Sequence, residues 1–162
     1  MSYDLFVFDP QLAPRDRVAF IQWYLDQVEN WPIDCDTLDQ MTGNLPRFYE
    51  LLRREFPPLN GPGAYDWDRS QGLPQSKPFW RKLVGLDRGV FTVRGAAIED
   101  RVTEYNFAKH SIYLNFGWSV SNSAWSGVFN AACSVGVGFF EASAENPPII
   151  YDRSDFDSVP GR

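Results

Sequence analysis

The spacing of apolar residues in the first half of the chain predicts one strand followed by two helices. Residues 3–8 form a nearly continuous apolar run that ends at Asp9-Pro10, which is typical of a buried strand. The next apolar side chains recur at helical spacing over a wide stripe, at positions 18, 20, 21, 23, 24, 25 and 28. We expect this helix to be covered on more than one side. A second helix is predicted from Asn44, a good N-cap, to Phe56.

The second half of the chain predicts a hairpin, a helix and two more strands. Residues 103–107 and 111–116 alternate between apolar and polar positions, and a short turn between them would pair the two segments. Apolar residues then follow one helical stripe from Ala124 to Cys133, and Gly136 is a natural end for this helix. Two further apolar runs predict the last strands, at 137–140 and 149–151.

Residues 57–88 are the least regular part of the chain. They contain 5 of the 12 prolines, so we expect a long irregular loop with one short helix near 79–84. A short strand is predicted after it, at 90–94. The polar residues 152–162 are expected to form a flexible tail. No composition change divides the remainder, so residues 1–151 are predicted to form a single domain.

The order of these elements predicts an α+β fold with a βαββαβ core, the ferredoxin-like arrangement. In this arrangement a single mixed or antiparallel sheet carries its helices on one face. A chain of 162 residues is long enough to bury a sizeable core around one such sheet. The irregular segment would then be a long loop insertion in this core.

The chain is acidic, with a net charge of −6 and a pI near 4.7. The local balance is −5 over residues 1–60, +2 over 61–110 and −3 over 111–162. Nucleic acids and anionic membrane surfaces are bound mainly through Lys and Arg, so we expect neither as a partner. An acidic surface instead favours a basic partner protein. No signal peptide and no run of 18 apolar residues is visible, which predicts a cytoplasmic protein.

Few residues of the chain could form a catalytic or metal centre. His110 is the single histidine, and it falls in the predicted hairpin turn, where an exposed histidine needs no special role. Cys35 and Cys133 lie too far apart in the sequence for a zinc-binding pattern. The acidic run at 34–39 lacks the glycine and the closing glutamate of an EF-hand. We therefore predict no metal, no cofactor and no catalytic residue.

One enzymatic alternative stays open. Asp66 and Asp68 are closely spaced carboxylates next to Tyr65 and Trp67, with Trp80 further along the chain. Aromatic rings stack on sugars and paired carboxylates cleave glycosidic bonds, so a small carbohydrate-active enzyme or other hydrolase is the main alternative function. Close acidic pairs also arise by chance in a chain with 21 acidic residues.

The six tryptophans exceed what a core of this size needs. Trp31 lies beside Asp34, Asp36 and Asp39, and an aromatic anchor next to acids suits a basic protein surface. Packing of Trp31 against the second helix is the alternative. The surplus aromatic residues would also be explained by a homodimer, as in an oligomeric housekeeping domain.

Several segments of the chain resemble a small family of bacterial proteins. The opening Met1–Pro10, with the run 13–17, carries the first match. Three further segments follow the same pattern, at 56–62, 111–119 and 136–140. The motifs MSYDL, FPPLNGP and GVGFF thus spread the resemblance over most of the chain. It implies a cytoplasmic α+β protein without a catalytic motif.

Some members of this family resemble immunity proteins of interbacterial toxin systems. The resemblance therefore implies a non-enzymatic protein that binds a cognate toxin, one with a basic surface, and occludes its active site. Residues 63–101 are longer and more basic than the family pattern, which makes them a candidate specificity element. The predicted partner-binding residues are Trp31, Asp34, Asp36, Asp39, Tyr65, Asp66, Trp67 and Asp68.

Overall fold

The computed structural model describes residues 2–29, 38–61, 63–64 and 99–157. The predicted short helix near 79–84, the predicted strand at 90–94 and most of the predicted loop at 57–88 lie outside these residues. The described elements are β1 (Tyr3–Phe8), α1 (Arg17–Glu29), η1 (Leu38–Gln40), α2 (Leu45–Leu52), η2 (Glu99–Arg101), β2 (Glu104–Ala108), β3 (Ser111–Phe116), η3 (Trp118–Val120), α5 (Ser121–Val135), β4 (Gly138–Phe140), β5 (Ile149–Ile150) and α6 (Arg153–Asp157).

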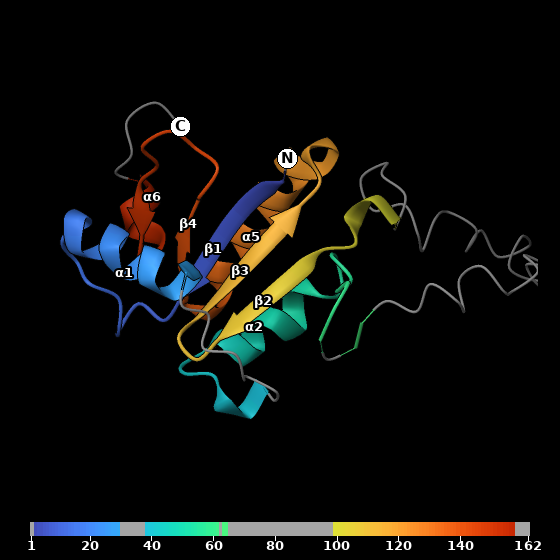
Figure 1. The fold of residues 1–162 in the computed structure, drawn as a ribbon, viewed down its shortest axis with the longest axis horizontal. Coiled ribbons are helices and arrows are strands. Elements are labelled where there is room, and N and C mark those ends of the chain that lie inside the picture. Colours follow the sequence, from blue (N-terminus) through green and yellow to red (C-terminus); the bar gives the residue numbers. More distant parts are fainter. Residues whose placement is uncertain (1, 30–37, 62, 65–98, 158–162) are drawn as a thin grey trace, which may run out of the picture.

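The described strands form one five-stranded antiparallel sheet in the order β2-β3-β1-β4-β5 (Figure 1). This confirms the α+β class and the single sheet. β3 lies between β1 and β2, and β1 lies between β3 and β4, so each helical connection joins two strands that flank a third. Part of the expected polar tail is helical, since α6 follows β5 directly.

One face of the sheet is covered by α2 and α5. β1 directs Leu5 and Val7 to this side, and both are fully buried. The helices contribute apolar residues at helical spacing, because Phe48 and Leu52 are four positions apart on α2. The predicted helix from Ser121 ends as expected, with Gly136 in the left-handed conformation at φ 73°.

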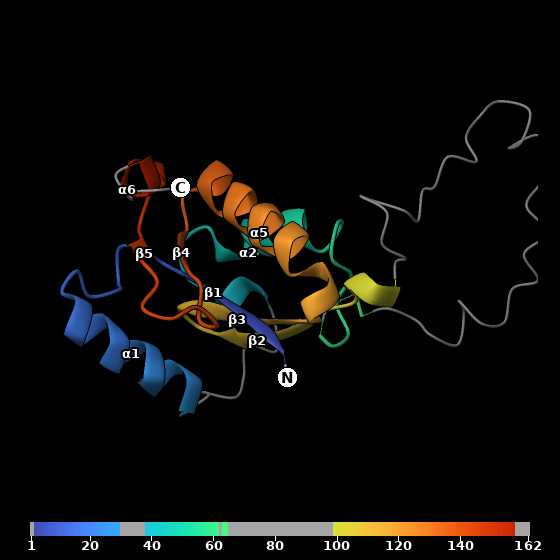
Figure 2. The same ribbon diagram turned by 90° about the horizontal axis from the view of Figure 1, so that it is seen from above.

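The opposite face of the sheet is covered by α1, so the prediction of helices on one face only is wrong (Figure 2). β1 alternates, and its other two large apolar residues, Phe6 and Phe8, point to this side. Phe20 of α1 lies 5.0 Å from Phe8 and 5.2 Å from Phe140, measured between ring centroids. A strand that is apolar on both sides requires cover on both sides, which is the physical reason for this second layer.

The sequence predicts that α1 is covered on more than one side, and the structure differs from this prediction. Phe20 is the one fully buried residue of this helix, and it faces the sheet together with Trp23 and Tyr24. Val18 is 78% exposed and Leu25 is also exposed. Among the described residues, α1 is therefore covered on its sheet side, and part of its predicted apolar stripe faces outward.

The chain just after α2 packs closely against α5 at one position, Gly127. A Cβ atom at this glycine would lie 2.8 Å from Cε2 of Phe56 and 3.4 Å from Oε2 of Glu55. Phe56 is fully buried, and its ring also packs against Phe116 at 5.1 Å. Glycine inside a helix costs about 1 kcal/mol relative to alanine, so its position here reflects this close packing.

The exposed edge of β2 is partly closed by the chain after α2. Asn60 uses its side-chain amide on both backbone groups of Tyr105, donating to its oxygen at 2.7 Å and accepting from its nitrogen at 2.9 Å. The backbone of Thr103 also pairs with the backbone of Pro57 and Leu59. These bonds occupy edge groups that would otherwise be open to pairing with another chain.

We expect Gly127→Ala to lower the free energy of unfolding by up to about 2 kcal/mol. Overpacking against Phe56 costs about 1–3 kcal/mol, and the better helix propensity of alanine recovers about 1 kcal/mol. Urea unfolding followed by circular dichroism measures this difference. Asn130→Ala is the matched control, since Asn130 is exposed on the same helix; equal effects of the two variants would contradict the close-packing argument.

We expect Asn60→Ala to lower the free energy of unfolding by about 1–3 kcal/mol, because it leaves both backbone groups of Tyr105 without the amide. Asn60→Asp keeps an acceptor for the Tyr105 N–H group but sets a carboxylate oxygen against the Tyr105 carbonyl oxygen, so we expect it to be destabilising as well. Urea unfolding compares both variants with the wild type. A loss below about 0.5 kcal/mol in both variants would refute this role of the amide.

Candidate functional site

The structure describes one of the eight predicted partner-binding residues. Asp39 lies exposed in η1, the short 3-10 helix that leads toward α2. The other seven lie outside the described residues: Trp31, Asp34, Asp36, Tyr65, Asp66, Trp67 and Asp68. Trp80, the third aromatic residue of the alternative sugar-binding site, also lies outside them. Whether the acidic loop and the paired carboxylates form sites therefore stays a prediction.

Exposed acidic residues border the segment 30–37 on both sides. α1 ends with Asp26 and Glu29, which are exposed, and Leu25 beside them is exposed as well. The chain is described again at η1, where Asp39 is exposed. α1 contains no lysine or arginine after Arg17, and η1 contains none. The negative charge on both flanks thus has no basic neighbour in the same element.

A second group of aromatic and acidic residues lies at one end of the sheet. Trp118 in η3 is 52% exposed, and its ring centroid lies 5.2 Å from that of Tyr3 at the start of β1. Tyr3 donates its hydroxyl to Oε1 of Glu141 at 2.7 Å. Trp125 of α5 donates its indole N–H to Oε2 of the same carboxylate at 3.0 Å. Glu141 thus joins β1 to α5 beneath the exposed ring.

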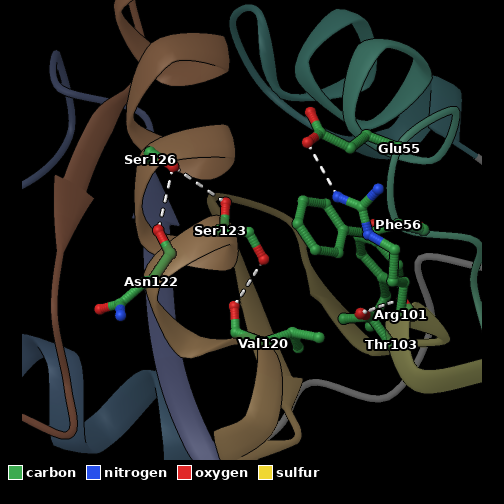
Figure 3. Close-up of polar contacts among 9 residues, drawn as sticks. Glu55, Phe56, Arg101, Thr103, Val120, Asn122, Ser123 and Ser126 are labelled. Atoms are coloured by element: carbon green, nitrogen blue, oxygen red, sulfur yellow. Dashed lines mark hydrogen bonds and ion pairs between the residues drawn. The ribbon is translucent and has the colours of Figure 1, made fainter. Parts of the chain in front are cut away.

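A buried ion pair fixes η2 near this end of the sheet (Figure 3). Arg101 is only 2% exposed, and its guanidinium donates to Oε1 of Glu55 at 2.9 Å. The same guanidinium lies 4.5 Å from the ring centroid of Phe56, a cation–π contact. Breaking a buried pair of this kind is costly, so the pair holds the start of β2 in place.

The serine hydroxyls drawn in Figure 3 are used within their own helix. Ser123 donates to the carbonyl oxygen of Val120 at 2.9 Å, and Ser126 donates to that of Asn122 at 3.0 Å. Such bonds stabilise the first turns of α5 and keep the hydroxyls directed at backbone. Neither serine has the neighbouring histidine that activates a serine nucleophile, since His110 lies at the other end of β3.

A row of hydrogen-bonded polar side chains crosses three strands on the α1 side of the sheet. Asn106 of β2 donates to Oδ1 of Asn115 on β3, and Asn115 donates to Oδ1 of Asp4 on β1, both at 2.9 Å. Glu104 pairs with Asn115 in register and is exposed. This row continues the face that carries Phe6 and Phe8, but it replaces apolar residues by carboxylates and amides.

Two tyrosines separate this polar row from the residues beneath α1. Tyr24 of α1 and Tyr113 of β3 stack with ring centroids 6.5 Å apart. Burial raises the pKa of Tyr24, and burial together with the neighbouring Tyr24 and Asp4 raises the pKa of Tyr113. Both phenols therefore stay protonated at neutral pH.

His110 lies in the two-residue turn between β2 and β3, as predicted, but it is half-buried instead of exposed. Its Nδ1 atom lies 3.1 Å from Oγ1 of Thr42, a hydrogen bond. Burial lowers the pKa of His110, and the positive charge of Lys109 lowers it further. The turn is held to the chain before α2 by this contact and by a backbone bond from Thr42 to Lys109 at 2.8 Å.

The described residues contain no group of three His, Cys, Asp or Glu side chains that could hold a metal ion. None of the helices among them is long and apolar enough to cross a bilayer. Cys133 is half-buried and packs against the main core, as its place on the apolar stripe predicted. Cys35 lies outside the described residues.

The sequence pattern does not predict the groups of polar and aromatic residues at this end of the sheet. Periodicity predicts that the polar positions of 111–116 share one face of their strand, but it does not link them to Asp4. The alternation of polar residues in 111–116 was the available signal. It became informative only once the register showed which residues of β1 and β2 lie beside them.

Comparisons with known proteins add no relative: no protein-family model matches the chain, and no curated protein or solved structure is significantly similar to it.

We expect the pKa of His110 to lie below its ordinary value of 6.5, and Lys109→Gln to raise it, because that substitution removes a neighbouring positive charge. Since the chain has a single histidine, its NMR signals report this value directly. Below pH 6.5 the unfolded chain therefore binds more protons at this histidine than the folded chain does. The contribution of His110 to the free energy of unfolding is fully present above pH 6.5 and decreases as the pH falls below it. A pKa above 6.5 would contradict the burial of this ring.

Proposed function

We propose that this chain is a non-enzymatic, immunity-type protein that binds a cognate bacterial toxin and occludes its active site. The family resemblance of its motifs and its net charge of −6 support this assignment. Many toxins act on nucleic acids and need a basic cleft for that purpose. An acidic protein that fills such a cleft prevents the substrate from entering it.

Exposed acids on both flanks of the segment 30–37 carry this proposal. Asp26 and Glu29 precede the segment, and Asp39 follows it. The predicted anchor Trp31 and the acids at 34 and 36 lie between them in the sequence. Acids that lack basic neighbours destabilise a folded protein slightly by mutual repulsion, and a basic partner relieves that repulsion on binding. This arrangement suits association that is fast and sensitive to salt.

The proposal includes a ferredoxin-like core for this protein. Two split βαβ units, in which a third strand lies between the two strands that a helix connects, support this core. β3 lies between β1 and β2, and β1 lies between β3 and β4. α2 and α5 would be the two helices of that core. β5, α1 and α6 would be additions to that core. As a separate part of the proposal, the protein would act in the cytoplasm.

The test uses the product of the gene next to that of this protein, which the proposal predicts to be a toxin domain. We expect co-expression of the two proteins to protect cells, and the purified pair to form a stoichiometric complex whose affinity falls as salt rises. The triple variant D34K/D36K/D39K should bind at least tenfold more weakly, with most of the change in the association rate.

A pair of single reversals separates a local effect from a change of net charge. Asp39→Lys should slow association more than Glu145→Lys, since both residues are exposed but only Asp39 belongs to the predicted patch. Absence of a complex and of protection would contradict the proposed function. Equal effects of the two single variants would leave the function intact but remove the patch from it.

A further inference from the structure

We infer that Asn60 is a modification site, at which spontaneous deamidation of the side-chain amide removes its contacts with β2. The backbone nitrogen of Gly61 is the attacking group, and water is the other reactant. The same contacts with β2 protect the amide while the chain is folded. This inference is independent of the proposed function, because it depends only on the chain after α2 and on β2.

The fold requires an asparagine at position 60. Its Nδ2 atom donates to the carbonyl oxygen of Tyr105 at 2.7 Å, and its Oδ1 atom accepts from the N–H of Tyr105 at 2.9 Å. A carboxamide offers a donor and an acceptor side by side, which a carboxylate or a hydroxyl of similar length does not. The preceding residues pair with the backbone of Thr103, so Asn60 extends a backbone pairing along β2 (Figure 1).

The fold also requires a glycine at position 61. Gly61 has a φ of 76°, in the left-handed region that favours glycine. A Cβ atom at this position would lie 2.8 Å from Cε2 of Phe107 on β2. Asn60-Gly61 is the one Asn-Gly pair in the sequence. This pair is the dipeptide most prone to deamidation, because glycine places no side chain beside the attacking nitrogen. The contacts with β2 thus fix a chemically labile pair at this edge.

Deamidation at this pair proceeds through a cyclic imide. The Gly61 nitrogen gives up its proton to water and forms a bond to Cγ of Asn60. The bond from Cγ to Nδ2 breaks, and the amide nitrogen leaves as ammonia. Water then opens the imide. Attack at Cγ gives aspartate, and attack at the backbone carbonyl carbon of Asn60 gives isoaspartate.

The contacts with Tyr105 oppose formation of the imide. Its five-membered ring contains Cα, Cβ, Cγ and the carbonyl carbon of Asn60 together with the Gly61 nitrogen. This nearly planar ring eclipses Cγ with the carbonyl carbon, whereas side chains in folded proteins occupy staggered rotamers. The amide must therefore rotate away from Tyr105 before it can react. The rate then depends on the fraction of time for which these contacts are open.

Deamidation removes the cover of β2 at Tyr105. Aspartate has no donor for the carbonyl oxygen of Tyr105, and isoaspartate also lengthens the main chain by one carbon atom. β2 is an edge strand of the sheet. Unpaired backbone groups on an edge strand are open to pairing with another chain. The modification thus acts as an irreversible switch that opens this edge.

The first arm of the test follows deamidation in the full-length protein, folded in buffer and unfolded in urea at the same pH. Mass spectrometry of the peptide that contains Asn60 quantifies its amide, aspartyl and isoaspartyl forms over time. We expect the folded chain to react at most about one-tenth as fast, since two hydrogen bonds must open first. Equal rates in the two states, or an unreacted Asn60 in the unfolded chain, would overturn the inference.

Two conservative variants separate the contacts of Asn60 from general stability. Tyr105→Phe removes the hydroxyl bond to the carbonyl oxygen of Phe56 at 2.7 Å, which holds the same stretch of chain to β2. We expect it to speed deamidation of the folded chain about fivefold. Tyr151→Phe is the matched control, because Tyr151 follows the opposite edge strand and donates its hydroxyl to the carbonyl oxygen of Pro14. Equal acceleration by the two variants would contradict protection by the contacts with Tyr105.

The second arm measures what the modification does to β2. Ion exchange separates aged from fresh protein, because each deamidation adds one negative charge. We expect hydrogen exchange of the backbone at residues 103–107 to be at least about threefold faster in the aged protein and in the variant Asn60→Asp. Unchanged exchange in both would overturn the opening of this edge. Circular dichroism melts of every variant confirm that the fold is retained.

Discussion

The burial of β1 on both of its faces is the constraint on which the described structure depends. Leu5 and Val7 require cover from α2 and α5, while Phe6 and Phe8 require cover from α1. Burying a large apolar side chain contributes about 1.5–3 kcal/mol, so four such residues on one short strand outweigh any single surface contact. β1 also occupies the middle position of the sheet, where it pairs with β3 on one side and β4 on the other. The strand therefore joins both apolar layers and two neighbouring strands at once.

This constraint also explains how far the aromatic layer on the α1 side of the sheet extends. The apolar row on the α1 side extends through Phe6, Phe8 and Phe140, and α1 follows that row. Arg17, the first residue of α1, donates hydrogen bonds to the backbone oxygen of Pro147 and to Oδ1 of Asn146. These two bonds set the direction of the helix across the sheet. At Asp4 the side chain on this face of β1 changes from aromatic to carboxylate, and the amides of β3 and β2 continue the polar row. The polar row is thus a consequence of where the apolar residues of this layer end.

The local elements could be predicted from the sequence, whereas the layers and the site could not. The strands at 3–8 and 111–116 and the helix that ends at Gly136 are confirmed, because each depends on short-range periodicity and turn chemistry. The prediction of helices on one face only is wrong. Periodicity shows that Phe6 and Phe8 share one face of their strand, but it does not show which helix covers that face. The contact of Asn115 with Asp4 joins residues 111 positions apart, and only strand register places them together. Exposure of Trp118 and burial of His110 depend in the same way on neighbours distant in sequence.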